Sequence, residues 1–202
     1  MPTGIALRDA RDLLFDAADR VLLHDGASGL TSRAVTTEAG VAKGVMHRHF
    51  ADFDAFLAEL VLNRAARLDG QAAALFESAG TATVADNLTN ALIALFGPVA
   101  VAIVGLVISR DGLRARLRQA GAARIPLLAE GTAMVASYLG AERDLGRIAA
   151  GADIHTLAPT IIGAAHLQFT DRESTPPDPA TVHKMVTTIM AGSTEGNDYG
   201  DD

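Results

Sequence analysis

The sequence predicts an all-α protein in which an N-terminal three-helix helix-turn-helix domain is followed by a larger helical domain. Apolar residues recur at helical spacing along most of the 202 residues, and no stretch shows the alternation of a strand. Aliphatic side chains dominate the 49% of hydrophobic residues, and only 4% of residues are aromatic. A chain of this length can bury a sizeable core.

Cysteine content and charge narrow the possible functions. The chain has no cysteine, which excludes disulfides and thiolate metal sites and fits the cytoplasm, where we expect the protein because its N-terminus has no secretory signal. The net charge of −7 disfavours general binding to nucleic acid. Within residues 31–50, however, Arg33, Lys43 and Arg48 outnumber the single acid Glu38, so a local basic surface is possible.

The first helix is expected from Arg8 to about His24. Its apolar residues recur at helical spacing and would face the rest of the domain, whereas several aspartates lie on the other side. Gly26 and Gly29 would end this helix. The residues that we expect it to bury are Leu14, Ala17, Ala18, Val21 and Leu22.

Leu30 to Phe50 has the pattern of two short helices joined by a tight turn. The Thr31 hydroxyl can cap the first helix by accepting a hydrogen bond from a backbone amide one turn ahead. Gly40 stands where a helix end often needs a left-handed residue. In the second helix, Met46 and Phe50 lie four residues apart and would form a narrow apolar back.

The front of this second helix is basic and sterically open. Lys43 and His47 share one face, and Gly44 and Arg48 share the next. A basic helix face alone would more often be merely solvated. After a glycine turn, however, such a helix can enter the major groove of DNA, where arginine can bind guanine and lysine can bind phosphate.

The run LTSRAVTTEAGVAKGVMHRHF resembles the DNA-binding signature of the tetracycline-repressor-like (TetR) family of bacterial transcriptional regulators. The likeness is strongest at Leu30-Thr31, Ala39-Gly40-Val41, Lys43-Gly44 and Arg48-His49-Phe50, which lie in the first quarter of the chain. Val45 could touch a thymine methyl group or pack in the core. From the pattern and the resemblance together, the predicted DNA-binding residues are Thr31, Arg33, Lys43, Gly44, Val45, His47, Arg48 and His49.

Three positions depart from the usual family pattern. Ala42 replaces a capping serine or threonine, His47 replaces a tyrosine, and Phe53 replaces a lysine. Each change removes a hydrogen-bond donor or acceptor near DNA, so a helical scaffold or partner-binding protein with weakened DNA recognition is the alternative function. An enzyme is a weaker alternative, because the sequence has no nucleophile, phosphate-binding, dinucleotide or metal motif, and no cofactor is expected.

The remaining chain is expected to form further helices. A helix from Phe53 to about Asp69, N-capped by Asp52, would connect the two domains, as the resemblance implies. Residues 70–80 have only a loose pattern. The later helices are predicted at Val84–Phe96, Pro98–Ser109, Arg110–Gln119, Pro126–Leu139, Ile154–Phe169 and Ala180–Ala191, with a loop at Thr175–Pro179 and a kink or start at Pro159.

One stretch, Ala91 to Ile108, is uncharged and about as long as a membrane helix. Gly97-Pro98 in its middle should instead end one buried helix and begin another, because proline suits a first helical turn. No second span and no aromatic belt accompanies it, so we expect no membrane segment.

A ligand site is expected among the middle helices. Their aromatic and aliphatic residues have few ionisable neighbours, so they could line an apolar cavity for a small hydrophobic effector. Core packing is the simpler explanation for each residue taken alone. The candidate ligand-binding residues are Phe76, Phe96, Ile103, Met134, Tyr138 and His166.

Two further groups of side chains have simpler explanations. The arginines between Arg110 and Arg118 are expected to form a solvated face, with the mouth of a ligand cavity as the alternative. His155 and His166 lie eleven residues apart without neighbouring carboxylates, which favours hydrogen bonding over a metal site.

The resemblance further implies a homodimer on a palindromic operator in double-stranded DNA. The last two helices would pair with their symmetry mates as a four-helix bundle. An effector that prefers one spacing of the DNA-binding heads would release the operator, so a repressor is expected. We assign residues 1–52 to the helix-turn-helix domain, 53–191 to the ligand-binding and dimerisation domain, and 192–202 to a disordered tail. The predicted interface residues are Ile161, Gly163, Ala164, Leu167, Val182, Met185, Val186 and Ile189.

Overall fold

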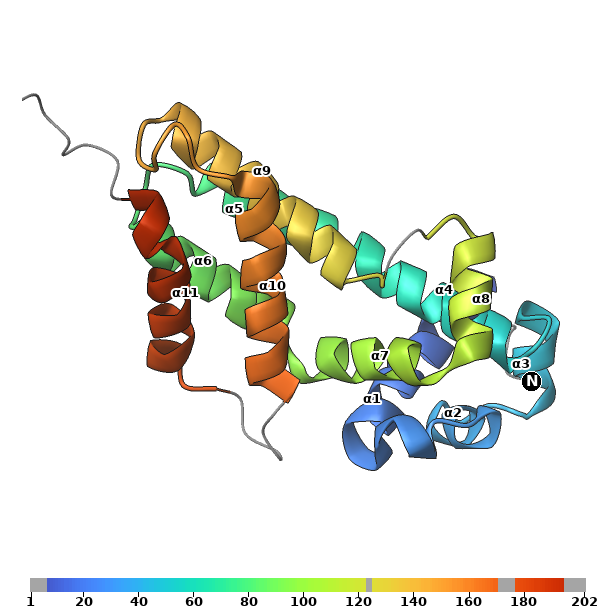
Figure 1. The fold of residues 1–202 in the computed structure, drawn as a ribbon. Helices are drawn as coiled ribbons and strands as arrows, with labels where there is room; N and C mark the ends of the chain where they lie inside the picture. The colour runs from blue at the N-terminus through green and yellow to red at the C-terminus, as the bar shows by residue number, and fades with distance from the viewer. Residues whose placement is uncertain (1–6, 123–124, 171–176, 195–202) are drawn as a thin grey trace, which may run out of the picture. The chain divides into compact units, whose positions relative to one another are not determined.

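The computed structural model describes residues 7–122, 125–170 and 177–194, and within these ranges the chain forms helices and no strand (Figure 1). The predicted all-α fold class is confirmed. The helices are α1 (Leu7–Gly29), α2 (Ser32–Glu38), α3 (Gly44–His49), α4 (Phe53–Ala66), α5 (Leu68–Glu77), α6 (Val84–Leu95), α7 (Pro98–Ser109), α8 (Asp111–Gln119), α9 (Leu128–Asp144), α10 (Ile154–Thr170) and α11 (Pro179–Thr194).

The chain divides into two compact units. The first unit contains Met1–Arg64 and Pro98–Pro126, and the second contains Ala65–Gly97 and Leu127–Asp202. These units differ from the predicted ranges 1–52 and 53–191, because α7 and α8 are grouped with the N-terminal helices. The predicted ranges describe functional modules and stay a prediction.

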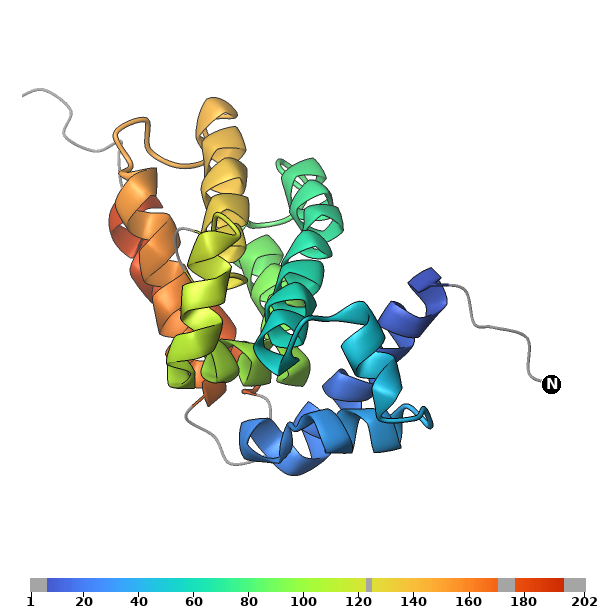
Figure 2. The ribbon, with the colours of Figure 1, turned by 90° about the vertical axis from the view of Figure 1, so that its right-hand side faces the viewer.

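An apolar core holds the first unit together. The face of α1 that the sequence predicted is buried, and it packs against α2 and α7 (Figure 2). The side chains of Phe15, Phe50 and Phe56 meet beside it, with ring centroids 5.0 to 5.9 Å apart. Such contacts between aromatic rings stabilise a core beyond the burial of their area.

A buried arginine joins α4 to α1. Arg64 is only 7% exposed, and its guanidinium donates to Asp19 at 2.9 Å and to Asp16 at 3.1 Å. The sequence placed both aspartates on a solvated face. A charged side chain is rarely buried without a partner, so the ion pairs explain how Arg64 is accommodated inside the unit.

The arginines of α8 fasten the start of α4. Asp52 caps α4 as predicted, since its Oδ1 accepts from the Ala55 amide at 2.8 Å. Arg116 pairs with Asp52, and Arg110 pairs with Asp54 at 3.1 Å. These two side chains are therefore engaged within the first unit and do not form the freely solvated face that the sequence predicted.

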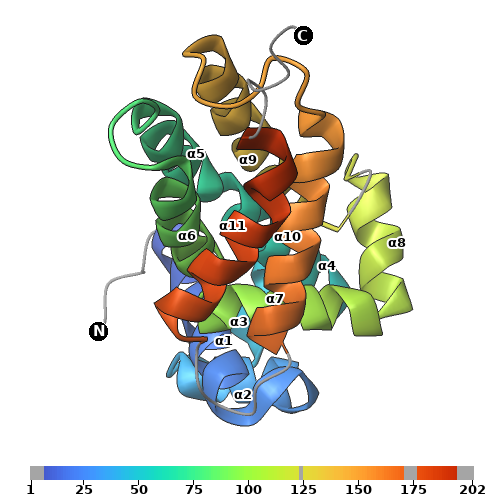
Figure 3. The same cartoon turned by 60° about the vertical axis from the view of Figure 1, so that its left-hand side comes forward.

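The second unit is a layer of helices in which α9 lies between α5 and α10, and α11 packs on α6 and α10 (Figure 3). Leucine, isoleucine and valine side chains fill the space between them. The most deeply buried of these residues include Leu88, Leu92, Val135, Leu139, Ile161, Val182 and Val186.

A polar network lies buried inside this unit. The Tyr138 hydroxyl donates to Glu142 Oε1 at 2.5 Å and accepts from Asn87 Nδ2 at 3.1 Å. Arg147 Nε pairs with the other oxygen of Glu142 at 3.2 Å. Burial, together with the hydrogen bond to Glu142, raises the pKa of Tyr138 well above its ordinary value, so the phenol stays a donor. The network ties α9 to α6 and to the loop after α9.

Several predicted helix boundaries need correction. Residues 70–80 contain most of α5, which the sequence missed because only Leu68 and Leu75 of this helix are buried. Helix α9 continues past Gly140 to Asp144 and is ended by Gly146, whose φ is 72°. Helix α10 begins at Ile154 and contains Pro159.

The end of α1 and the C-terminal tail differ in part from their predictions. Helix α1 extends to Gly29, beyond the end near His24 that the sequence predicted. Its backbone is not helical at Gly26, where φ is 68°. Residues 192–194 of the predicted tail are helical within α11, and 195–202 lie outside the described residues, as do 171–176, which include part of the predicted loop.

The predicted break of the apolar stretch at Gly97-Pro98 is confirmed, since α6 ends at Leu95 and α7 begins at Pro98. In the part of the chain that the structure describes, no single helix is long and apolar enough to cross a membrane; α6 and α7 pass that test only when taken together.

Replacing Tyr138 with phenylalanine should destabilise the protein by about 1–3 kcal/mol, because the change removes the hydrogen bonds that the hydroxyl makes with buried Glu142 and half-buried Asn87. Urea unfolding followed by circular dichroism measures the change. Ser109→Ala is the control, since Ser109 is exposed and its hydroxyl bonds only to the Leu106 carbonyl within α7. Equal unfolding free energies for Tyr138→Phe and the parent would contradict the role of the network.

Candidate nucleic-acid interface

The turn between α2 and α3 is fixed by backbone geometry. Thr31 caps α2 as predicted, its Oγ1 accepting from the Ala34 amide at 3.1 Å. Gly40 has a φ of 67° and donates to the Thr37 carbonyl at 3.1 Å, while Val41 donates to the Thr36 carbonyl at 3.0 Å. This pair of bonds closes the end of α2 and turns the chain into α3.

Helix α3 is held down by its apolar side. Met46 and Phe50 are 1% and 3% exposed, as the sequence predicted from their spacing. Phe50 packs on the rings of Phe15 and Phe56, and Met46 Sδ accepts from the Ser32 hydroxyl at 3.1 Å. Because the helix has only six residues, these contacts determine which side faces outward.

The opposite side of α3 is open to solvent and basic. Lys43, His47 and Arg48 are exposed, and a Cβ at Gly44 would meet no atom within 4 Å. On α2, the side chains of Thr31 and Arg33 are also exposed, whereas Val45 and His49 are half-buried. Among the described residues, no ion pair or side-chain hydrogen bond occupies Arg33, Lys43 or Arg48, so these cations are available to a ligand.

The acid closest in sequence to this face is itself neutralised. Glu38, the only carboxylate of α2, accepts from Arg20 Nε of α1 at 2.6 Å. Both side chains are exposed, so the pair contributes little to stability. Its effect is on the local charge: the exposed surface around α2 and α3 keeps an excess of positive charge although the chain as a whole is acidic.

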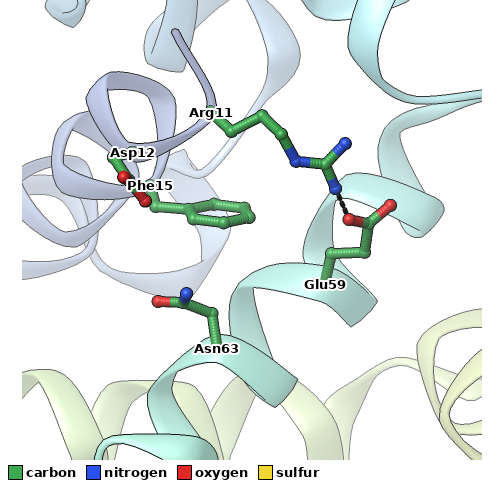
Figure 4. A pocket seen from close by; sticks show the side chains of 5 residues that line it. All are labelled: Arg11, Asp12, Phe15, Glu59 and Asn63. Atoms are coloured by element: carbon green, nitrogen blue, oxygen red, sulfur yellow. Dashed lines mark ion pairs between the residues drawn. The ribbon is translucent and has the colours of Figure 1, made fainter. Parts of the chain in front are cut away.

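Arg11 braces the end of α3, which the sequence analysis missed. Its guanidinium lies 4.6 Å from the centre of the Phe50 ring, donates to the His49 carbonyl at 3.4 Å and pairs with Glu59 of α4 (Figure 4). Together with Phe15 and Asn63 it lines an open hollow of about 390 Å³ between α1 and α4. The signal was the one-turn spacing of Arg11 and Phe15, which puts the cation beside the aromatic core.

The six predicted ligand residues lie in several different surroundings. Ile103 is buried in the core of the first unit, and Tyr138 belongs to the polar network. Phe96 is buried with its ring 5.4 Å from Phe169 and 6.0 Å from His166. Among the described residues, Phe76 and Met134 both line a groove between α5 and α9.

The two histidines of α10 have no metal-binding geometry. His155 is exposed, and His166 is half-buried with no hydrogen-bond partner for Nδ1 among the described residues. Burial lowers the pKa of His166, which favours its neutral form at pH 7. Within the described ranges, no three His, Cys, Asp or Glu side chains are grouped so as to hold a metal ion.

The predicted interface residues divide into two sets. Gly163 and Leu167 of α10 are exposed, the latter by 68%, and Ala164, Met185 and Ile189 are half-buried. Ile161, Val182 and Val186 are fully buried. The side chains of these three fill the protomer's own core, and the interface itself stays a prediction.

Comparisons with known proteins agree with the fold and the turn. Residues 14–60 match the family described as bacterial regulatory proteins, tetR family. No curated protein matches the chain in sequence.

Solved structures resemble the chain over nearly its whole length. One from Mesorhizobium loti MAFF303099, described as a TetR-family transcriptional regulator, has a TM-score of 0.69 at 16% identity and covers 95% of this chain and 100% of its own. A TetR-family regulator from Agrobacterium tumefaciens has a TM-score of 0.69 at 12% identity, covering 93% and 99%. The multidrug binding protein EbrR, complexed with imidazole, has a TM-score of 0.59 at 22% identity, covering 89% and 93%. At such low identities these likenesses establish the fold.

Two glycine substitutions test whether the turn depends on the positive φ of Gly40. Gly40→Ala should destabilise the protein by about 1 kcal/mol, because a positive φ strains alanine although nothing lies within 4 Å of the new Cβ. Gly44→Ala, equally uncrowded and without a positive φ, should be neutral or stabilising. Urea unfolding of both variants measures this; the same loss in both would show that the turn does not depend on Gly40.

Proposed function

We propose that the chain is a DNA-binding transcriptional regulator of the tetR family, whose family model matches residues 14–60, and that it is a homodimeric repressor released from a palindromic operator by a small effector. One observation carries the proposal. The side of α3 opposite its buried Met46 and Phe50 exposes Lys43 and Arg48 as unpaired cations.

The residues of α2 and α3 suit different parts of an operator. Arg48 can bind a guanine edge through two hydrogen bonds, and Lys43, at the start of α3, can bind phosphate. Gly44 leaves room for close approach of the backbone. Thr31 and Arg33 on α2 would contact the DNA backbone, and His47 can donate to a phosphate where relatives usually have tyrosine.

A homodimer would use the outer side of α10 and α11. Thr156, Thr160, Gly163 and Leu167 lie on one exposed face of α10, and this helix has no charged side chain other than histidine. An exposed, uncharged face with a 68% exposed leucine favours protein contact over solvent. A two-fold dimer would set two copies of α3 into major grooves about one turn, roughly 34 Å, apart.

Helix α4 is the route by which an effector could act on α3. The boundary between the two units falls inside α4, between Arg64 and Ala65. Within the first unit, α4 reaches the end of α3 through Glu59 and Arg11. An effector bound by the second unit would release DNA if it preferred a conformation of α4 that separates the two reading heads differently. Support for small-molecule binding comes from EbrR, which was solved with imidazole.

The double change Lys43→Ala and Arg48→Ala should weaken binding to a duplex selected from a random pool by at least about tenfold. It should also flatten the plot of log affinity against log salt by about two charges. Fluorescence anisotropy with labelled duplex measures both quantities. Arg118→Ala, which removes an exposed arginine of α8, is the control. Unchanged affinity in the double variant would refute α3 as the reading helix.

Gly163→Arg should convert the dimer into a monomer and reduce operator affinity by at least about tenfold, because two half-sites can then no longer bind together. The change is sterically free within the protomer, since nothing lies within 4 Å of a Cβ there. Gly105→Arg, at an equally open helical position on α7, is the matched control. Sedimentation velocity gives the mass; a Gly163→Arg dimer would exclude this face.

A further inference from the structure

The groove between α5 and α9 in the second unit has the size of a small-molecule site. The two helices pack against each other (Figure 1), and the groove has a volume of about 390 Å³. Sites for small molecules fall in a range of roughly 300–1,000 Å³. The residues that line it are Leu68, Asp69, Ala72, Ala73 and Phe76 of α5 with Glu130, Ala133, Met134 and Ser137 of α9.

The apolar part of this lining is shaped to receive a guest. Leu68 and Met134 are buried to 6% and 3% exposure and form its floor. The alanines on both helices have short side chains, which leaves the space above the floor open. Phe76 borders the groove with 51% of its surface exposed, which is unusual for so large an aromatic residue. A guest with an apolar body would cover this exposed ring.

The charged part of the lining is entirely acidic. Asp69 and Glu130 are the ionisable residues in the lining, which contains no lysine, arginine or histidine. Within the described residues neither carboxylate forms an ion pair, and Glu130 Oε2 accepts from the Leu127 amide at 2.6 Å. Two carboxylates beside an apolar surface attract a cation and repel an anion.

We propose that this groove binds an organic cation with an aromatic or aliphatic body, an inference that rests on the proposed function for the role of that cation as the effector. The cationic group would lie near Asp69 and Glu130, and the apolar body would cover Met134 and the ring of Phe76. An exposed aromatic face adds attraction for a cation within about 6 Å. The sequence predicted a small hydrophobic effector, and this proposal adds a positive charge to it.

Binding of two ions of matched size and opposite charge tests the proposal. Tetraphenylphosphonium and tetraphenylborate are added separately to the full chain, without DNA, in sodium buffer, and binding is measured by isothermal titration calorimetry. Tetraphenylphosphonium should bind at least about tenfold more tightly than tetraphenylborate. Equal binding of the two ions, or tighter binding of the anion, would overturn the proposal.

Two variants locate the site. Asp69→Asn with Glu130→Gln should weaken tetraphenylphosphonium binding at least about tenfold while keeping the hydrogen bond to the Leu127 amide, because glutamine still offers an oxygen. Glu77→Gln, which removes an exposed acid of α5 outside the groove, should leave binding unchanged. Equal loss in both variants would mean that net charge, and not the groove, attracts the cation.

A final experiment distinguishes a failure of the proposed site from a failure of its proposed effector role. The selected duplex is bound first, and tetraphenylphosphonium is then titrated. Release of DNA by the parent but not by the Asp69→Asn, Glu130→Gln variant supports both the site and its effector role. Cation binding that leaves operator affinity unchanged supports the site and overturns the effector role, and intact DNA binding without cation binding overturns the site alone.

Discussion

The burial of Met46 and Phe50 beneath α3 is the constraint on which the rest depends. The two side chains are nearly inaccessible, and Phe50 is clamped between Phe15 and Phe56. Fully burying a side chain of this size contributes about 1.5–3 kcal/mol to stability. A surface ion pair contributes only about 0–1 kcal/mol, so burial of the apolar side decides the orientation of the helix. In a helix as short as α3, burying the apolar face leaves the opposite face exposed. Lys43 and Arg48 therefore face outward because the apolar side is held inside.

Helix α4 is the second element that organises the first unit. Its start is fastened by Asp52 and Asp54 to the arginines of α8, and its end by Arg64 to the aspartates of α1. Between them, Glu59 holds Arg11 against the end of α3. Most of these ion pairs are partly exposed and each contributes little to stability. Their joint effect is to couple the position of α4 to that of α3, which the proposed response to an effector requires.

The sequence predicted what local rules control and missed what depends on distant partners. The cap at Thr31, the glycine turn at Gly40 and the buried pair Met46 and Phe50 follow from spacing and backbone preference, and all three predictions are confirmed. Helix α5 escaped because too few of its residues are buried to create a periodic signal. The spacing of Arg11 and Phe15 points only to the aromatic core, whereas His49, the partner of Arg11, and Asp16 and Asp19, the partners of Arg64, lie 38 to 48 residues away and could not be inferred from spacing. Ile161, Val182 and Val186 look the same in sequence whether they face a core or a partner.

Acetylation of lysine side chains tests the central claim most directly, because Lys43 and Lys184 are the two lysines of the chain and both are exposed. The protein is labelled with and without the selected duplex, and mass spectrometry gives the rate at each lysine. The account predicts that DNA slows acetylation of Lys43 several-fold and leaves Lys184 of α11 unchanged. Equal labelling of Lys43 in the free and DNA-bound protein would contradict it, since the basic side of α3 would then not face the DNA.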